Sequence, residues 1–315
     1  MVQPRVLCAV LVAVFALPVA AQTPKPSPSS ARRRKPIVAA SPKPLPSPRP
    51  TPRPVPLAGA FGTGSLLCTL QSPFISESSG IAASRRNPGV FWTHNDSGDG
   101  AYLYAFDRKG KTVGVYLAHS AFAGDWEDID VAPGADGKGS FIYIADTGDY
   151  AKNRADTCVY RIPEPVLSRQ TRVGTQSRPL LTETRAERLL FAYPDGFHDT
   201  EALLVHPQTG AIYLVTKEEN GAADVYKFPP LKAVENPLTR HVLQKIGSLT
   251  FSEAGLHPFP NRVTGGDIAP DGKRLLVRTY YAAYEWRLPD GETDFDAIWN
   301  TAPVSVALPT QPQGE

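Results

Sequence analysis

The chain has 315 residues, of which 42% are hydrophobic, with 33 basic residues against 31 acidic ones. The first 56 residues hold nine of the basic residues and no acidic one, so the remaining 24 basic residues face all 31 acids. A net charge of about −7 on that remainder makes nucleic acid a poor partner for it.

Residues 1–21 predict a secretory signal peptide. One basic residue, Arg5, precedes an apolar stretch from Val6 to about Ala16, and small residues end the segment before an expected cleavage at Gln22. The stretch is too short to span a membrane comfortably, and no other long apolar run follows. We therefore expect an exported monomer, periplasmic or extracellular, with no transmembrane segment in the mature chain.

Residues 22–56 predict a disordered, proline-rich linker. Proline lacks an N–H and fixes φ, which favours an extended, polyproline-like spacer over helix or sheet. The segment carries eight Lys or Arg residues, four of them in the run Arg32–Lys35. This basic character indicates either attachment to an anionic polymer or lipid of the cell envelope, or a solvated spacer without a partner.

Residues 57–315 predict one all-β domain in which a strand–turn–strand–turn–strand unit recurs. Each unit opens on an acidic or glycine-containing leader: Glu77–Ile81, Asp125–Ile129, Asp199–Leu203 and Gly265–Ile268. Aromatic or β-branched runs follow in each unit: Val90–Thr93, Phe141–Ile144, Ala211–Leu214 and Leu275–Arg278, then Tyr102–Phe106, Cys158–Ile162, Asp224–Phe228 and Tyr284–Leu288. Such repetition is typical of a β-propeller, in which small sheets are arranged around one axis.

The turns between these runs set the expected strands of four blades. Blade one is expected at 79–83, 90–94, 102–107 and 112–118, and blade two at 127–132, 141–146, 157–162 and 187–192. Blade three is expected at 201–206, 211–216, 223–228 and about 241–251, and blade four at 265–269, 273–280, 282–288 and about 303–308. A long insertion, Glu164–Glu187, precedes the last strand of blade two.

The two ends of this domain predict a five-bladed ring whose last blade is incomplete. Gln311–Glu315 resembles the start of another inner strand, and Leu66–Leu70 precedes blade one without belonging to it. In many propellers an N-terminal strand completes the last blade, so we expect Leu66–Leu70 to be an orphan outer strand beside an open gap between blades four and one. Truncation and a small natural blade count both fit this pattern.

Hairpin geometry places the leaders on the same face as the residues that follow each second strand. That face is expected to collect Glu77, Asp96, Asp99, Glu127, Asp128, Asp146, Asp149, Asp199, Glu201 and Asp267, with His94, Arg154, Lys217 and Arg278. Converging carboxylates repel one another, and Ca²⁺ suits a loose cage of oxygen ligands better than Mg²⁺ does. The alternative is that Asp and Gly form ordinary turns and that the acids pair with nearby cations.

Several motifs in residues 77–315 resemble a known group: ESSGIA, NPGVFWTHNDSGD, DWEDID, ADTGD, CVYRIPEP, YPDGFHDTEALLVHP and VRTY. Together they look like exported bacterial β-propeller proteins of the phytase-like group, which is described as having an esterase-like activity of phytase. The resemblance implies a calcium-dependent phosphoester hydrolase that works through acidic residues.

Two functions from different classes remain open. One is an envelope binding or scaffold module with a calcium site. The other is a calcium-assisted hydrolase of phosphoesters or lactone-like esters that acts on a small anionic substrate. The expected metal ligands are Asp96, Asp99, Asp128, Asp146, Asp149, Glu201 and Asp267; the expected catalytic residues are His94 as base, Glu127, and Lys217 and Arg278 as the cations that neutralise the substrate.

Overall fold

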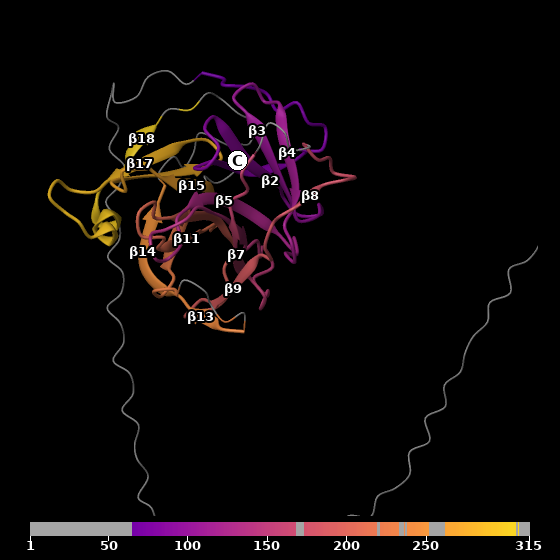
Figure 1. Ribbon diagram of the computed structural model, residues 1–315. Helices are drawn as coiled ribbons and strands as arrows, with labels where there is room; N and C mark the ends of the chain where they lie inside the picture. The colour runs from indigo at the N-terminus through magenta and orange to yellow at the C-terminus, as the bar shows by residue number, and fades with distance from the viewer. Residues whose placement is uncertain are drawn as a thin grey trace, which may run out of the picture. The chain divides into compact units, whose positions relative to one another are not determined.

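The computed structural model describes residues 65–167, 173–218, 221–232, 236, 238–251, 262–306 and 308. The predicted signal peptide, the linker and Gln311–Glu315 lie outside these residues. The described chain forms four sheets, each built on an antiparallel meander, and the sheets make a four-bladed β-propeller (Figure 1). None of the described helices is long and apolar enough to cross a membrane.

Each blade begins with an inner strand and proceeds outward. Blade one contains β1 (Ser78–Ala83), β2 (Val90–Asn95), β3 (Tyr102–Asp107) and β4 (Thr112–Leu117), with β8 (Leu180–Leu181) at its edge. Blade two contains β5 (Trp126–Ala132), β6 (Phe141–Asp146), β7 (Cys158–Pro163) and β9 (Glu187–Ala192), with β13 (Arg240–Val242) at its edge. Blade three contains β10 (Thr200–Val205), β11 (Ile212–Thr216), β12 (Ala222–Lys227) and β14 (Gln244–Thr250). Blade four contains β15 (Val263–Ile268), β16 (Arg274–Thr279), β17 (Ala283–Arg287) and β18 (Val304–Val306), with the 3-10 helix η1 (Phe295–Asn300) before β18.

Three hydrophobic cores hold the four blades together, one between each consecutive pair. Trp92 and Ile144 belong to the core between blades one and two, whereas Leu275 belongs to the core between blades three and four. Within the described part of the chain, no buried cluster joins blade four to blade one. Since side chains alternate along a strand, Ile81 of β1 and Leu276 of β16 point away from the cores, and they are 59% and 38% exposed.

The expectation of a five-bladed ring is wrong, because the described residues form four blades. Leu66–Leu70 is not the expected orphan strand; it has no regular secondary structure. This segment runs beside the β3–β4 turn, where the Gln71 N–H donates to the Gly110 carbonyl at 2.9 Å. The exposed faces of blades one and four agree with the expected gap between them.

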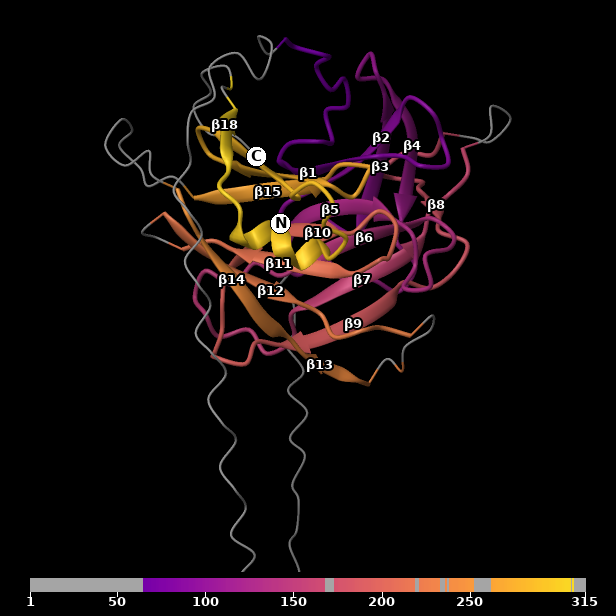
Figure 2. The same ribbon diagram turned by 90° about the vertical axis from the view of Figure 1, so that its left-hand side faces the viewer.

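A β-bulge lies at the start of all four inner strands, which gather at the centre of the sheets (Figure 2). Each bulge inserts a residue that has no partner on the second strand, and a bulge re-aims the side chain it carries. The inserted residues are Ser79, Glu201 and Thr264 in blades one, three and four, and in blade two the irregularity spans Glu127 and Asp128; all five residues are buried. The same irregularity therefore turns one side chain per blade toward the centre.

Candidate metal centre

A pocket of about 300 Å³ opens at the end of the propeller where the inner strands begin. All four blades contribute to its lining, which consists of Asp96, Ser97, Asp125, Glu127, Tyr150, Asp199, Glu201, Lys217, Arg262 and Tyr280. Five carboxylates face two cations in this lining, so five negative charges against two positive ones leave an excess of three when all are ionised. The excess sets this pocket apart from an ordinary network of ion pairs.

One backbone hydrogen bond recurs in every blade and fixes the lining. The N–H of the residue after the second strand donates to the carbonyl of the residue two places before the bulge. The four bonds are Asp96 to Glu77 at 2.9 Å, Thr147 to Asp125 at 3.1 Å, Lys217 to Asp199 at 2.8 Å and Tyr280 to Arg262 at 3.1 Å. Residues from two separate loops of each blade are thus held side by side at the pocket.

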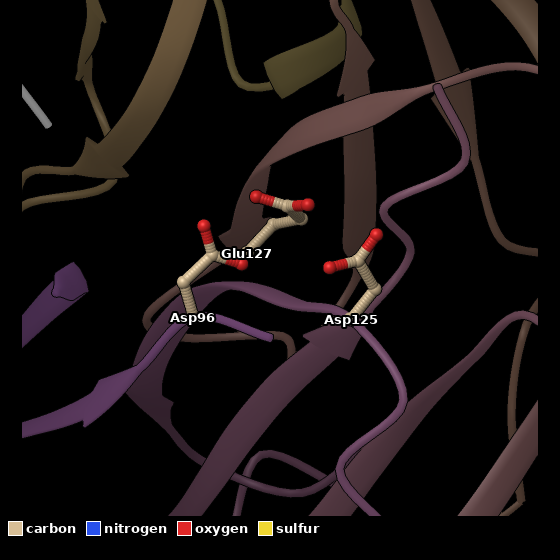
Figure 3. A group of neighbouring side chains, drawn as sticks. All are labelled: Asp96, Asp125 and Glu127. Carbon is tan, nitrogen blue, oxygen red and sulfur yellow. The ribbon is translucent and has the colours of Figure 1, made fainter. Parts of the chain in front are cut away.

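Glu127 is the carboxylate around which the acidic side chains converge. Oxygen atoms of Asp96, Asp125 and Glu127 lie within 4.8 Å of one another, and their carboxylates point toward a common space (Figure 3). Oxygen atoms of Glu127, Asp199 and Glu201 form a second set within the same limit. The two sets share Glu127 and together contain acids from blades one, two and three.

The pKa shifts in the pocket reflect burial and crowding of like charges. Burial raises the pKa of Glu127, and the neighbouring Glu201, Asp96 and Asp125 raise it further. Burial, followed by the charge of Asp96, raises the pKa of Asp125 to about 6. Burial likewise raises the pKa of Asp199. Repulsion between the ionised carboxylates therefore destabilises the folded protein at this site, and the binding of protons or of a cation relieves that repulsion.

Lys217 neutralises one of the acids. Its Nζ lies 2.5 Å from Glu201 Oε1 and 5.4 Å from the centre of the Tyr280 ring. Burial opposes the charged form, but the Glu201 carboxylate outweighs it and raises the pKa of Lys217. Lys217 was expected at this face as a cation for an anionic substrate, and it does line the pocket.

Asp146 and Asp149 do not line the pocket as expected of metal ligands. Asp146 Oδ1 lies 2.8 Å from Arg154 Nη2 and accepts the Asp125 N–H at 3.0 Å. Asp149 accepts the N–H groups of Asn153 and Arg154, at 2.9 and 2.8 Å. The Asp146-Thr-Gly-Asp149 motif thus folds the loop after β6 onto itself, with Asp146 Oδ1 and both oxygens of Asp149 accepting hydrogen bonds within it.

Asp128, another expected ligand, lies on the axis of the propeller and holds the blades together. Its Oδ2 accepts the Leu203 N–H of β10 at 2.9 Å, and its Oδ1 accepts the Ile129 N–H at 2.8 Å. Glycine allows β1 to approach here, because a Cβ on Gly80 would stand 2.9 Å from Asp128 Oδ1. Burial raises the pKa of Asp128 well above its usual range, as expected for an acceptor enclosed by backbone.

The register of blade four differs from the expected one. Its bulge is at Thr264, so Arg262 occupies the position held by Asp125 and Asp199 in the preceding blades. Asp267 lies beyond the bulge on the exposed part of β15, outside the pocket lining. Arg278 is within β16, one residue short of the strand end, and the pocket is lined by Tyr280 instead.

His94 and Asp99 also lie outside the pocket lining. The His94 ring is fully buried 5.5 Å from the Trp126 ring, and its Nδ1 lies 2.8 Å from the Asn95 carbonyl oxygen. Burial lowers the pKa of His94, which removes the case for it as a base in contact with solvent. Asp99 accepts hydrogen bonds from Asn95 Nδ2 at 2.6 Å and from the Tyr104 hydroxyl at 3.1 Å, in a separate loop.

Of the expected site residues, the pocket brings together Asp96, Glu127, Glu201 and Lys217. Asp125, Asp199, Arg262, Tyr150 and Tyr280 line it without having been assigned a role. A signal for two of them is present in the sequence, since Asp125-Trp-Glu127 and Asp199-Thr-Glu201 repeat an Asp-x-Glu pattern at equivalent positions. Side chains two residues apart in an extended chain point to the same side, so both acids of each pair can face the same space.

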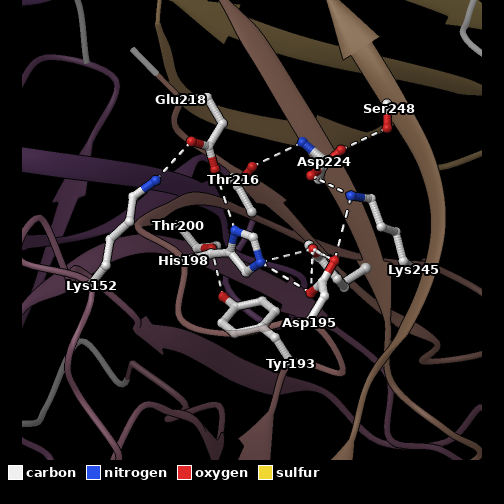
Figure 4. A network of polar contacts seen from close by, with 11 residues as sticks. Lys152, Tyr193, Asp195, His198, Thr200, Thr216, Glu218, Asp224, Lys245 and Ser248 are labelled. Atoms are coloured by element: carbon white, nitrogen blue, oxygen red, sulfur yellow. Dashed lines mark hydrogen bonds and ion pairs between the residues drawn. The ribbon is translucent and has the colours of Figure 1, made fainter.

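A second polar network lies beside the pocket and has a different character (Figure 4). The His198 ring lies between two acids, with Nε2 3.1 Å from Asp195 Oδ1 and Nδ1 3.3 Å from Glu218 Oε1. Lys152 pairs with Glu218 at 2.8 Å, and Lys245 lies 3.5 Å from Asp195. Each acid here has a cationic or imidazole partner, so this network is held together by pairing.

Comparison with known proteins finds similar solved structures but no family. No protein-family model and no curated protein matches the chain. Similar solved structures include a "putative 6-phosphogluconolactonase" from Bacteroides uniformis (12% identity, TM-score 0.35, 74% of this chain and 57% of that one). The Dos1 propeller (9%, TM-score 0.33, 74% and 48%) and the Cps50 (Swd1) β-propeller domain of Myceliophteria thermophila (12%, TM-score 0.36, 72% and 58%) are also similar. The chain spans about half the length of these structures, and likeness at this level says nothing of ligand or activity.

Proposed function

We propose that the chain is a calcium-binding β-propeller that uses the acidic pocket to hold a small anionic group. The observation that carries this proposal is the pair of overlapping carboxylate sets that share Glu127. Ca²⁺ takes oxygen ligands at about 2.3–2.6 Å, so two ligands of one ion are at most about 5 Å apart. In each of the two sets, one oxygen atom from every residue lies within 4.8 Å of the others, which is below that limit. Asp96, Asp125, Glu127, Asp199 and Glu201 would hold the ion.

The basic and hydroxyl side chains in the lining of the pocket favour an anionic ligand. Lys217, Arg262 and Tyr280 line it together with the acids, and the space of about 300 Å³ exceeds what an ion alone fills. An ion held by fewer protein oxygens than it prefers completes its shell with oxygens of a ligand or water. A phosphate-like or carboxylate group within reach of both the ion and Arg262 would fit this lining.

Hydrolysis of a phosphoester or lactone-like ester is a second candidate, favoured by Asp125. This residue lines the pocket and is only partly buried, so its carboxylate can reach a water molecule there. When bound, calcium would polarise the ester oxygen or an attacking water. Arg262 would orient the anionic group, and Asp125 would take a proton from water.

A calcium titration followed by melting temperature tests the binding proposal. Calcium at a hundredfold excess over its Kd is expected to stabilise the fold by about 2.7 kcal/mol, and a chelator is expected to reverse the effect. The proposal is contradicted if calcium, added to protein from which a chelator has first removed bound metal, does not change the melting temperature. A screen of generic phosphoesters and lactones, with and without chelator, separates the two candidates: calcium-dependent turnover favours the hydrolase, and calcium binding without turnover favours the binding module.

The context of this function is also a proposal. The signal-like segment 1–21 and the basic residues of 22–56 support export and contact with an anionic polymer of the cell envelope. Binding of the full chain to anionic and neutral polymer beads at several salt concentrations tests this contact. Retention that is independent of polymer charge contradicts it.

A further inference from the structure

A second pocket, of about 370 Å³, lies at the opposite end of blade three from the acidic site. The β10–β11 turn, the end of β12 and the loop before η1 contribute to it. Its walls include the aromatic and proline residues Tyr213, Phe228, Pro229, Pro230 and Phe295. Grooves with such walls accept extended proline-rich peptides, whose backbone is already ordered before binding.

The walls are held firmly by contacts of their own. The Phe295 ring lies 4.9 Å from the His206 ring and 5.5 Å from the Tyr213 ring. The Tyr213 hydroxyl donates to Asp296 at 2.8 Å, and the Lys227 ammonium pairs with the same carboxylate at 2.6 Å. The shape of the pocket therefore does not depend on a ligand.

The charge around this pocket is negative. Lys227 is the one basic residue in the lining, and Asp296 already balances it. Asp294 also lines the pocket, and Glu292 and Asp290 precede it in the same exposed loop. Among the described residues, no salt bridge is formed by these three acids. The pocket thus combines aromatic walls with an acidic rim, and the ligand that fits both is a proline-rich segment carrying Lys or Arg.

The chain contains such a segment. Residues 46–56 read PSPRPTPRPVP, in which Pro-Arg-Pro occurs twice with Arg49 and Arg53 four residues apart. We propose that this segment folds back and docks in the pocket of its own chain, with prolines against the aromatic walls and the two arginines on the acidic rim. Covalent geometry allows it: the nine residue steps from Pro56 to Ser65 span up to about 30 Å. A domain of this size has a radius of gyration of only about 18 Å.

Competition with a labelled peptide tests the proposal in the full-length chain. The probe is a fluorescent peptide with the sequence of residues 46–56, and the readout is fluorescence anisotropy at low salt. In the wild type the attached segment occupies the pocket and the probe binds weakly. R49E/R53E releases the pocket, so we expect this variant to bind the probe at least tenfold more tightly.

A second experiment neutralises the acidic residues Asp290, Glu292 and Asp294 at the edge of the pocket. D290N/E292Q/D294N keeps every side-chain acceptor that Glu292 and Asp294 use in their loop, where they accept the N–H groups of Thr293 and Asp296. Added to R49E/R53E, it is expected to weaken probe binding at least tenfold. The matched control D107N/D156N/E183Q removes three acids elsewhere on the propeller and is expected to leave binding unchanged.

Three outcomes overturn the proposal. The first is no probe binding to R49E/R53E, and the second is equal binding to R49E/R53E and the wild type. The third is a wild-type dimer in analytical ultracentrifugation that R49E/R53E abolishes, since the segment would then dock on a second copy.

Discussion

Glu127 is the residue whose environment is set most clearly by the charges around it. It is buried, it belongs to both carboxylate sets, and its pKa is raised by burial and by three neighbouring acids. A buried charge without enough countercharge is costly, and the cost disappears when a cation binds or the charge is removed. The same side chain therefore destabilises the cation-free protein and stabilises the cation-bound one.

The substitution Glu127→Gln separates these two effects. We expect it to raise or leave unchanged the melting temperature in chelator, because a neutral amide replaces a crowded carboxylate. We also expect it to abolish the calcium-induced rise, which is about 2.7 kcal/mol at a hundredfold excess for the wild type. Asp146→Asn is the control: it removes the negative charge that faces Arg154 at 2.8 Å, so it lowers the melting temperature in both conditions but keeps the calcium response. Identical behaviour of the two variants would refute a metal role for Glu127.

The dependence of stability on pH follows from the same shifts. Asp125 has a pKa of about 6 in the folded state and an ordinary value of 3.8. Between these values the folded protein keeps a proton that the unfolded chain has lost, so the free energy of unfolding falls as pH rises through this window. The raised pKa values of Glu127 and Glu201 act in the same direction.

In chelator we therefore expect the melting temperature to decrease from about pH 4 to pH 6. In calcium the decrease should vanish or reverse, since the ion binds the deprotonated carboxylates. Differential scanning calorimetry at constant ionic strength checks both curves. A melting temperature in chelator that increases steadily across this range would show that these acids are paired in the folded state.

At the scale of elements, the loop after β6 covers the acidic cluster closely. A Cβ on Gly148 would stand 2.1 Å from Glu127 Oε1 and 2.4 Å from Asp125 Oδ2. Only a glycine allows the backbone to pass there without displacing the carboxylates. The loop is positioned from the other side by the Thr147 hydroxyl, which donates to the Thr200 carbonyl of β10 at 2.8 Å.

Gly148→Ala should therefore disturb the site as well as the fold. We expect a loss of about 1–3 kcal/mol in stability, as for overpacking of a core, and at least a tenfold weaker calcium affinity. Gly247→Ala is the matched control, because a Cβ there would meet its nearest atom, Trp299 Cβ, at an ordinary 3.5 Å. Calorimetric titration and thermal melts check both variants. An unchanged calcium affinity in Gly148→Ala would place the ion away from Glu127 and Asp125.

The four blades could be predicted because aromatic and β-branched runs alternate with strong turn residues. The short strands β8 and β13 and the helix η1 could not, since segments of two, three and six residues are too short to show a periodicity. At the site, period-two alternation would place Glu127 and Asp128 on opposite faces of one strand. The bulge breaks this alternation of side chains. Because a bulge is a backbone feature with no fixed residue type, the sequence does not reveal which of the two acids faces the pocket and which one bonds to the neighbouring blade.

At the scale of the whole molecule, four blades share three cores. Leu275 and Leu276 are neighbours on β16, yet the first is fully buried against blade three and the second is 38% exposed toward blade one. We expect Leu275→Ala to cost about 2–5 kcal/mol of stability and Leu276→Ala to cost less than about 1 kcal/mol. Urea unfolding of the two variants gives the comparison. Equal costs would mean that another element covers this face of blade four in solution.

The acidic pocket, which all four blades line, also reaches the join between blades four and one, where the described residues form no core. Asp96 belongs to blade one, whereas Arg262 and Tyr280 belong to blade four, and no hydrophobic cluster of described residues connects these two blades. A ligand that contacts Asp96 through an ion and Arg262 directly would therefore link blade one to blade four, two blades that have no hydrophobic core of described residues between them. Part of the free energy of binding would then go into restricting the relative motion of these two blades. Without a ligand, blades one and four would separate more readily than any other neighbouring pair.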